Sequence, residues 1–122
     1  SVEPHNIFKR SEENLYYELP ISFTDAALGA TVEVPSIDGG KTKIKIPSGT
    51  QSGKQLRLKG KGMPVLKRNI FGDLYIRIVT EIPTSLTKRQ KELLAEFKTL
   101  EDTKSNPLIK SFFDKAKKFW KN

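Results

Sequence analysis

The stretch LYYELPISF, residues 15–23, decides the fold class of this 122-residue chain. Every odd-numbered position in it is large and apolar, whereas the even-numbered positions include Glu18, Pro20 and Ser22. This period of two predicts a β-strand with one buried face. Because Pro20 has no amide hydrogen to donate to a neighbouring strand, we expect a sheet edge or a bulge at that point.

Four further segments alternate in the same way: residues 31–34, 41–46, 55–59 and 73–82. Turns rich in glycine and proline separate them, and Asp38-Gly39-Gly40 is a strong hairpin signal. Thr24 is expected to cap a short helix over residues 25–28, and Ile82 is expected to face the core at the end of the last strand. Short alternating strands joined by such turns are typical of a small β-sandwich.

After Pro83 the apolar period becomes that of a helix. Thr87 and Gln90 form a capping-box pattern, and a helical apolar stripe continues to Leu100. The sequence therefore predicts a mainly β chain with a small β-sandwich domain over residues 1–83, followed by a tail of two helices over residues 84–122.

The second of these helices, residues 107–122, carries one apolar face. Asn106 suits the N-cap and Pro107 the first helical position. On a helix, the apolar side chains fall within an arc of roughly 140°; they are Leu108, Ile109, Phe112, Phe113, Ala116, Phe119 and Trp120. Lysines occupy the opposite side. Such a face either packs on its own domain or docks on a partner.

Lysines opposite an aromatic face also describe a helix lying in a membrane interface, although no apolar run approaches the ~20 residues that span a bilayer. We favour contact with another protein. The chain has no cysteine and only one histidine, His5, so thiolate chemistry, metal sites and Ser/His/Asp catalysis are disfavoured. Asp25, Asp38 and Asp73 read as turn or cap residues. We therefore expect a cytoplasmic protein that is not an enzyme and has no cofactor.

Two basic features admit a ligand interpretation. The loop GTQSGK, residues 49–54, has the wrong spacing for a phosphate-binding loop and leads into a strand instead of a helix. The net charge of +8 and the lysines of the predicted strands leave open a basic β-domain that binds RNA or single-stranded DNA; these lysines are Lys41, Lys43, Lys45, Lys54, Lys59 and Lys61. A solvated sheet face is the simpler interpretation of them.

Many short motifs occur in a fixed order: Val2-x-x-His5-x-x-Phe8-x-Arg10, Asn14-Leu15-Tyr16, Pro20-Ile21-Ser22-Phe23, Ala26-Ala27-Leu28-Gly29, Val34-Pro35, Asp38-Gly39, Ile46-Pro47-x-Gly49-Thr50-Gln51-x-Gly53-Lys54, Leu58-Lys59-Gly60-Lys61-Gly62-x-Pro64, Gly72-Asp73-Leu74, Pro83-x-x-Leu86 and Gln90-Lys91-x-Leu93-Leu94. Through residue 97 the chain thereby resembles the second carboxy-terminal domain of DnaJ-type co-chaperones. The resemblance implies a module that binds non-native polypeptides for a DnaK-class ATPase and joins two protomers into a homodimer. The family's J-domain, zinc module and first carboxy-terminal domain have no counterpart in this sequence.

The resemblance also implies which residues bind polypeptide and which form the dimer. Tyr17, Leu19 and Val34 match a polypeptide-binding groove between the first two strands, although they would equally fill the sandwich core. His5 and Phe8 are expected at an inter-domain junction. By position, the dimerisation residues are those of the terminal helix: Leu108, Ile109, Phe112, Phe113, Phe119 and Trp120. Neither specific nucleic acid nor membrane is expected as a partner.

Overall fold

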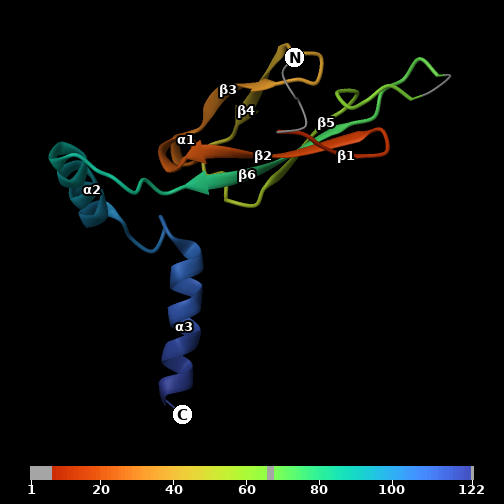
Figure 1. The fold of residues 1–122 in the computed structure, drawn as a ribbon. Helices are drawn as coiled ribbons and strands as arrows, with labels where there is room; N and C mark the ends of the chain where they lie inside the picture. Colours follow the sequence, from red (N-terminus) through yellow and green to blue (C-terminus); the bar gives the residue numbers. More distant parts are fainter. Residues whose placement is uncertain (1–6, 66–67, 122) are drawn as a thin grey trace. The chain divides into compact units, whose positions relative to one another are not determined.

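A computed structural model describes residues 7–65 and 68–121 of the chain. His5, which the sequence placed at an inter-domain junction, lies outside these residues. The chain divides into two compact units, Ser1–Pro83 and Thr84–Asn122 (Figure 1). The first unit holds all the strands of the described residues, and the second holds two helices.

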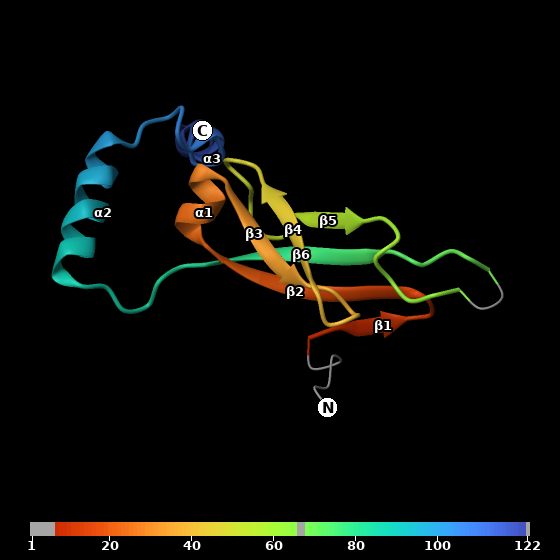
Figure 2. The same ribbon diagram turned by 90° about the horizontal axis from the view of Figure 1, so that it is seen from above.

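The first unit is a two-layer β structure. Its elements are β1 (Lys9–Ser11), β2 (Asn14–Ser22), α1 (Phe23–Leu28), β3 (Ala30–Pro35), β4 (Lys41–Ile46), β5 (Gln55–Leu58) and β6 (Leu74–Glu81). One sheet has the strand order β1-β2-β6-β5, and β3 and β4 form a separate hairpin. The hairpin crosses over the larger sheet (Figure 2). The expected mainly β architecture with two C-terminal helices is therefore confirmed.

The core lies between the two sheets because the alternating strands turn their apolar positions toward each other. β2 contributes Leu15, Tyr17 and Ile21, and β6 contributes residues that are almost completely buried. The remaining core positions come from the hairpin, α1 and the N-terminal segment. The whole buried set is Phe8, Leu15, Tyr17, Ile21, Ala26, Val34, Ile44, Ile46, Leu74, Ile76 and Ile78.

β2 and β6 run parallel, with Leu15 opposite Leu74 and Ser22 opposite Glu81. On its other side, β2 pairs with β1 only through residues 14–16. Beyond Tyr16, that side of β2 has no strand partner among the described residues. Pro20 therefore lies at a sheet edge, as its missing amide hydrogen predicts.

Two local expectations need correction, and one strand was not foreseen. The sequence did not indicate β1, because its three exposed residues carry no apolar alternation. Ser22, not Thr24, is the N-cap of α1, and its hydroxyl accepts a hydrogen bond from the Asp25 amide at 3.1 Å. Ile82 is exposed, because β6 ends one residue before it.

The segment between β5 and β6 is held against the β1–β2 turn. Gly62 donates to the Gly72 carbonyl at 2.8 Å, and a Cβ on either glycine would overlap the carbonyl oxygen of Glu13. Asp73 accepts from Arg57 Nε at 2.7 Å and from the Gly60 amide at 3.0 Å. These bonds hold the pKa of Asp73 below its usual value, first through the Gly60 amide and then through Arg57. They also fix the position of Arg57 beside β6.

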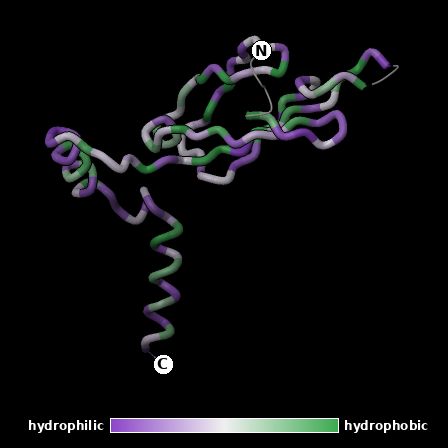
Figure 3. Tube along the Cα trace, in the orientation of Figure 1, coloured by the Kyte–Doolittle hydropathy of each residue, from purple (hydrophilic) through white to green (hydrophobic). Residues whose placement is uncertain are grey.

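The second unit contains α2 (Lys88–Leu100) and α3 (Pro107–Lys121). Thr87 and Gln90 form the expected capping box: the Gln90 amide donates to Thr87 Oγ1 at 3.1 Å, and the Thr87 amide donates to Gln90 Oε1 at 2.8 Å. Along both helices, hydrophobic and hydrophilic positions alternate with the helical repeat (Figure 3). No helix in the described part of the chain is long and apolar enough to cross a membrane.

Candidate polypeptide-binding and dimerisation surfaces

The three residues expected in a polypeptide-binding groove lie close to the seam between the two sheets. Tyr17 and Val34 belong to the core, with 5% and 1% of their surfaces exposed, whereas Leu19 is half-buried against it. The Tyr17 hydroxyl donates to the Pro35 carbonyl at 3.2 Å and so ties β2 to β3. A polypeptide can reach Leu19 directly, but it can reach Tyr17 and Val34 only if the sheets separate locally.

Phe8, which was expected at an inter-domain junction, packs in the core of the first unit. Its ring is 5% exposed and meets the Tyr17 ring edge-on, with the centroids 5.1 Å apart. Phe8 therefore closes the core at the β1 end of the sheet. This role could not be read from the sequence, because Ile7 and Phe8 precede a short polar strand and show no alternation that would mark Phe8 as a core residue.

Burial raises the pKa of Tyr17 to about 12, from the usual value of 10. Because the folded state holds this proton more tightly, the unfolded state ionises first as the pH passes 10. The contribution to stability is therefore complete below pH 10 and is lost as the pH rises to about 12. We expect the free energy of unfolding to fall by about 2–3 kcal/mol between pH 10 and pH 12 because of this group, and we expect Tyr17→Phe to remove this fall.

Urea unfolding between neutral pH and pH 12 measures this effect. Tyr16→Phe is the matched control, because Tyr16 is exposed on the opposite face of the same strand. An identical alkaline loss in wild type and Tyr17→Phe would show that other groups govern it.

The outer face of the four-stranded sheet carries a feature that the sequence analysis missed. Lys9, Tyr16, Tyr75 and Arg57 are neighbours on β1, β2, β6 and β5 in one row across the sheet. The Tyr16 and Tyr75 rings are stacked, with centroids 5.1 Å apart and planes 14° apart. The parallel pairing of β2 with β6 creates this row. In the sequence, the indication of this row was that each tyrosine occupies an outward position of its own strand.

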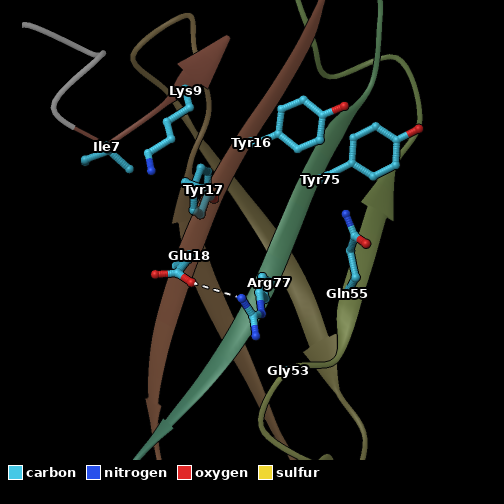
Figure 4. Close-up of a pocket in the computed structure, with 9 residues that line it drawn as sticks. All are labelled: Ile7, Lys9, Tyr16, Tyr17, Glu18, Gly53, Gln55, Tyr75 and Arg77. Atoms are coloured by element: carbon cyan, nitrogen blue, oxygen red, sulfur yellow. Dashed lines mark ion pairs between the residues drawn. The ribbon is translucent and has the colours of Figure 1, made fainter. Parts of the chain in front are cut away.

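A shallow cavity of about 770 Å³ lies over this row. It extends from β1 to the start of β5, where Gly53 and Gln55 border it. In Figure 4 the two tyrosine rings lie side by side, and Glu18 reaches Arg77 in an ion pair. The Glu18 carboxylate and the Arg77 guanidinium are 3.6 Å apart. The cavity thus combines an aromatic floor with charged groups of both signs.

The apolar face of α3 is exposed along its whole length. Each of the residues expected to form a dimer interface is between 47% and 77% exposed: Leu108, Ile109, Phe112, Phe113, Phe119 and Trp120. The adjacent rings of Phe112 and Phe113 meet edge-on, with centroids 5.0 Å apart. An exposed aromatic surface of this kind is typical of interaction sites.

The polar side of α3 is basic and carries its own ion pair. Lys110 Nζ lies 2.6 Å from Asp114 Oδ2, one helical turn away. This bond holds the pKa of Asp114 below its usual value. α2 has an exposed apolar side as well, formed by Leu93, Phe97 and Leu100. The second unit therefore offers two apolar helix faces for contact.

The remaining charged groups of the described residues form no cluster suited to a metal ion. Lys41, Lys43 and Lys45 are exposed on β4, where Lys41 lies 3.6 Å from Glu33. Across residues 7–65 and 68–121, no three His, Cys, Asp or Glu side chains come close enough together to hold a metal ion.

Comparison with known proteins identifies the family. A family model described as the DnaJ C terminal domain matches residues 1–83, and one described as the Chaperone protein DnaJ C-terminal region matches residues 89–122. The chain is 62% identical to the Chaperone protein DnaJ of Pelagibacter ubique over 122 residues, which are 100% of this chain and 32% of that protein. It is 58% identical to the protein of the same name from Azorhizobium caulinodans, over 98% of this chain and 32% of the relative.

A third relative, the Chaperone protein DnaJ of Brucella abortus, is 52% identical over the same shares of the two chains, 98% and 32%. The chain thus spans about a third of the length of these relatives. Both family models and the whole-length identity agree with the motif order and with the β-sandwich followed by two helices. The chain belongs to the DnaJ C-terminal domain family.

Proposed function

We propose that this chain is the part of a DnaJ-type co-chaperone that dimerises and holds non-native polypeptides for a DnaK-class ATPase. It acts in the cytoplasm by binding, without catalysis and without a cofactor of its own. The observation that carries the proposal is the exposed aromatic face of α3 in a chain of this family. Two of these chains hide that face by docking it on each other.

The proposed dimer interface rests on the six exposed apolar residues of α3. Fully burying a large apolar side chain contributes about 1.5–3 kcal/mol. In a two-fold interface each of these residues is buried twice, once on each protomer, so its contribution to the binding free energy is doubled. This is ample for a stable dimer after the cost of association.

The proposed polypeptide site lies at the open side of β2. Beyond Tyr16, the side of β2 that faces away from β6 has no strand partner among the described residues, and the half-buried Leu19 lies on this stretch of the strand. Backbone pairing at a sheet edge accepts many sequences, while an apolar contact rewards exposed hydrophobic side chains. Both properties suit a protein that binds unfolded chains. Dimerisation joins two weak sites and increases avidity by a factor of ~10²–10⁴.

Binding to a reduced, carboxymethylated protein that stays unfolded tests the proposal. We expect wild-type protein to bind it, and Leu19→Ser to weaken that binding by about tenfold, a loss of roughly 1.4 kcal/mol. Leu28→Ser is the matched control, because Leu28 is 80% exposed and belongs to α1, not to β2.

Failure of wild type to bind unfolded protein would contradict the polypeptide-binding proposal. Tight binding to RNA or single-stranded DNA with a steep salt dependence would favour the alternative function, a basic nucleic-acid-binding domain.

A further inference from the structure

The cavity on the outer face of the four-stranded sheet has no part in the proposed function. Its floor belongs to β2 and β6 and faces away from the core, whereas Leu19 of the proposed polypeptide site packs against the core. The cavity volume of about 770 Å³ falls within the range of roughly 300–1,000 Å³ that is typical of sites for small ligands. The side chains around the cavity therefore indicate what kind of molecule it accepts.

The floor of the cavity is a platform of two aromatic rings, Tyr16 and Tyr75. Their planes are 14° apart and their centroids 5.1 Å apart, so together they form a flat apolar surface wider than one ring (Figure 4). Tyr16 is 36% exposed and Tyr75 is half-buried, so solvent reaches the platform. Flat aromatic molecules stack on such rings, and a fused two-ring system covers this pair better than a single ring does.

The charges around the platform leave one cation without a partner. Arg77 is paired with Glu18, whose carboxylate lies 3.6 Å from the guanidinium. Arg57, at the β5 end of the tyrosine row, is paired with Asp73 at 2.7 Å. Lys9, at the β1 end, forms no ion pair with any described residue. An anionic group attached to a stacked ring would therefore find its counter-charge at Lys9.

We propose that this cavity binds a planar aromatic anion with the chemistry of a mononucleotide, its base stacked on the Tyr16–Tyr75 pair and its phosphate beside Lys9. The polar edge of the base meets the exposed Glu18–Arg77 pair, which supplies both hydrogen-bond donors and acceptors. Such a site goes beyond polypeptide binding and dimerisation and rests on neither of them.

A single nucleotide fits this face better than a nucleic acid strand. Glu18 follows Tyr16 by two residues along β2, and Asp73 precedes Tyr75 by two residues at the start of β6, so a carboxylate borders the platform at each end. A phosphate chain that runs along these strands would be repelled by both carboxylates. A mononucleotide needs only the one unpaired cation.

Isothermal titration calorimetry on the 122-residue chain tests the proposal with adenosine monophosphate as the probe. Adenosine and ribose 5-phosphate are the comparison ligands, because each keeps only one of the two proposed contacts. We expect adenosine monophosphate to bind at least about tenfold more tightly than either of them. Tyr75→Leu should reduce its affinity to that of ribose 5-phosphate, and Lys9→Gln should reduce it to that of adenosine.

Phe71→Leu and Lys45→Gln are the matched controls, because they change an exposed ring and an exposed lysine of the first unit that do not line the cavity. Neither should change the affinity for adenosine monophosphate by more than about twofold. Amide chemical shifts provide a second measurement, and on titration the largest changes should fall on Lys9, Tyr16 and Tyr75. An excess of carboxymethylated unfolded protein should leave the affinity unchanged.

Equal affinities for adenosine monophosphate and ribose 5-phosphate would refute the stacking, and shifts confined to other surfaces would refute the location. Displacement of the nucleotide by unfolded protein would assign the cavity to the polypeptide site instead. An oligoadenylate that binds at least about a hundredfold more tightly than the mononucleotide, and loses this binding with Tyr75→Leu, would assign the platform to a nucleic acid strand. Each of these results overturns the proposal, and none depends on whether the chain dimerises.

Discussion

Alanine at both Phe112 and Trp120 is expected to turn the proposed dimer into a monomer. The two rings lie on the exposed face of α3, where 63% and 69% of their surfaces are open to solvent in the single chain. Each ring that becomes buried contributes about 1.5–3 kcal/mol, and a two-fold interface loses both rings from both protomers. The dissociation constant should therefore rise by at least about a thousandfold, or roughly 4 kcal/mol.

Sedimentation equilibrium at micromolar concentration measures this change directly. Lys115→Ala with Lys118→Ala is the matched control, since both lysines lie on the polar side of the same helix and should leave the dimer intact. Removing the residues after Leu100 should give a monomer whose β structure is unchanged by circular dichroism. A wild-type chain that sediments as a monomer would refute the dimer.

Ile76→Ala is expected to be the most destabilising single change in the first unit. Ile76 has no exposed surface, and it lies on β6 between β2 and β5 at the centre of the larger sheet. Truncating a large buried aliphatic side chain to alanine costs about 2–5 kcal/mol, because the hydrophobic contacts are lost and a cavity remains. This is a large share of the stability of a small domain.

Urea unfolding followed by circular dichroism in the β region measures the loss, since the only tryptophan, Trp120, lies in α3 and reports on the second unit. Val79→Ala provides the comparison, because Val79 is on the outer face of the same strand and is only half-buried. We expect it to cost less than about 1 kcal/mol. Similar costs for the two substitutions would mean that the core does not lie where the structure places it.

Much of the first unit could be predicted from local patterns. The alternation in residues 15–23 indicated which side chains of β2 face the core, and Leu15, Tyr17 and Ile21 do so. Asp38-Gly39-Gly40 indicated the β3–β4 hairpin, whose turn closes with the Ser36 amide donating to the Gly40 carbonyl at 3.0 Å. Such signals are readable because side-chain alternation and turn conformation depend on residues close in sequence.

The candidate sites were less accessible to this kind of reasoning. The resemblance proposed Tyr17 and Val34 as polypeptide-binding residues, but a strand pattern cannot tell a groove residue from a core residue. The structure buries both and leaves Leu19 the more accessible. The local pattern placed Tyr16 and Tyr75 on the outward faces of their strands but could not pair them, because they are 59 positions apart and meet only through the parallel register of β2 and β6.

The sequence by itself determined the strands β2 to β6, the two C-terminal helices, the aromatic side of α3 and the family of this chain. Each of these follows from residue order over short distances or from motifs that need no three-dimensional arrangement. Only the tertiary structure decided which strands are neighbours, that Phe8 closes the core against Tyr17, and that β5 is an edge beside a tyrosine-floored cavity. The physical reason is that strand order and register depend on how distant segments bury their apolar faces together, which no local pattern encodes.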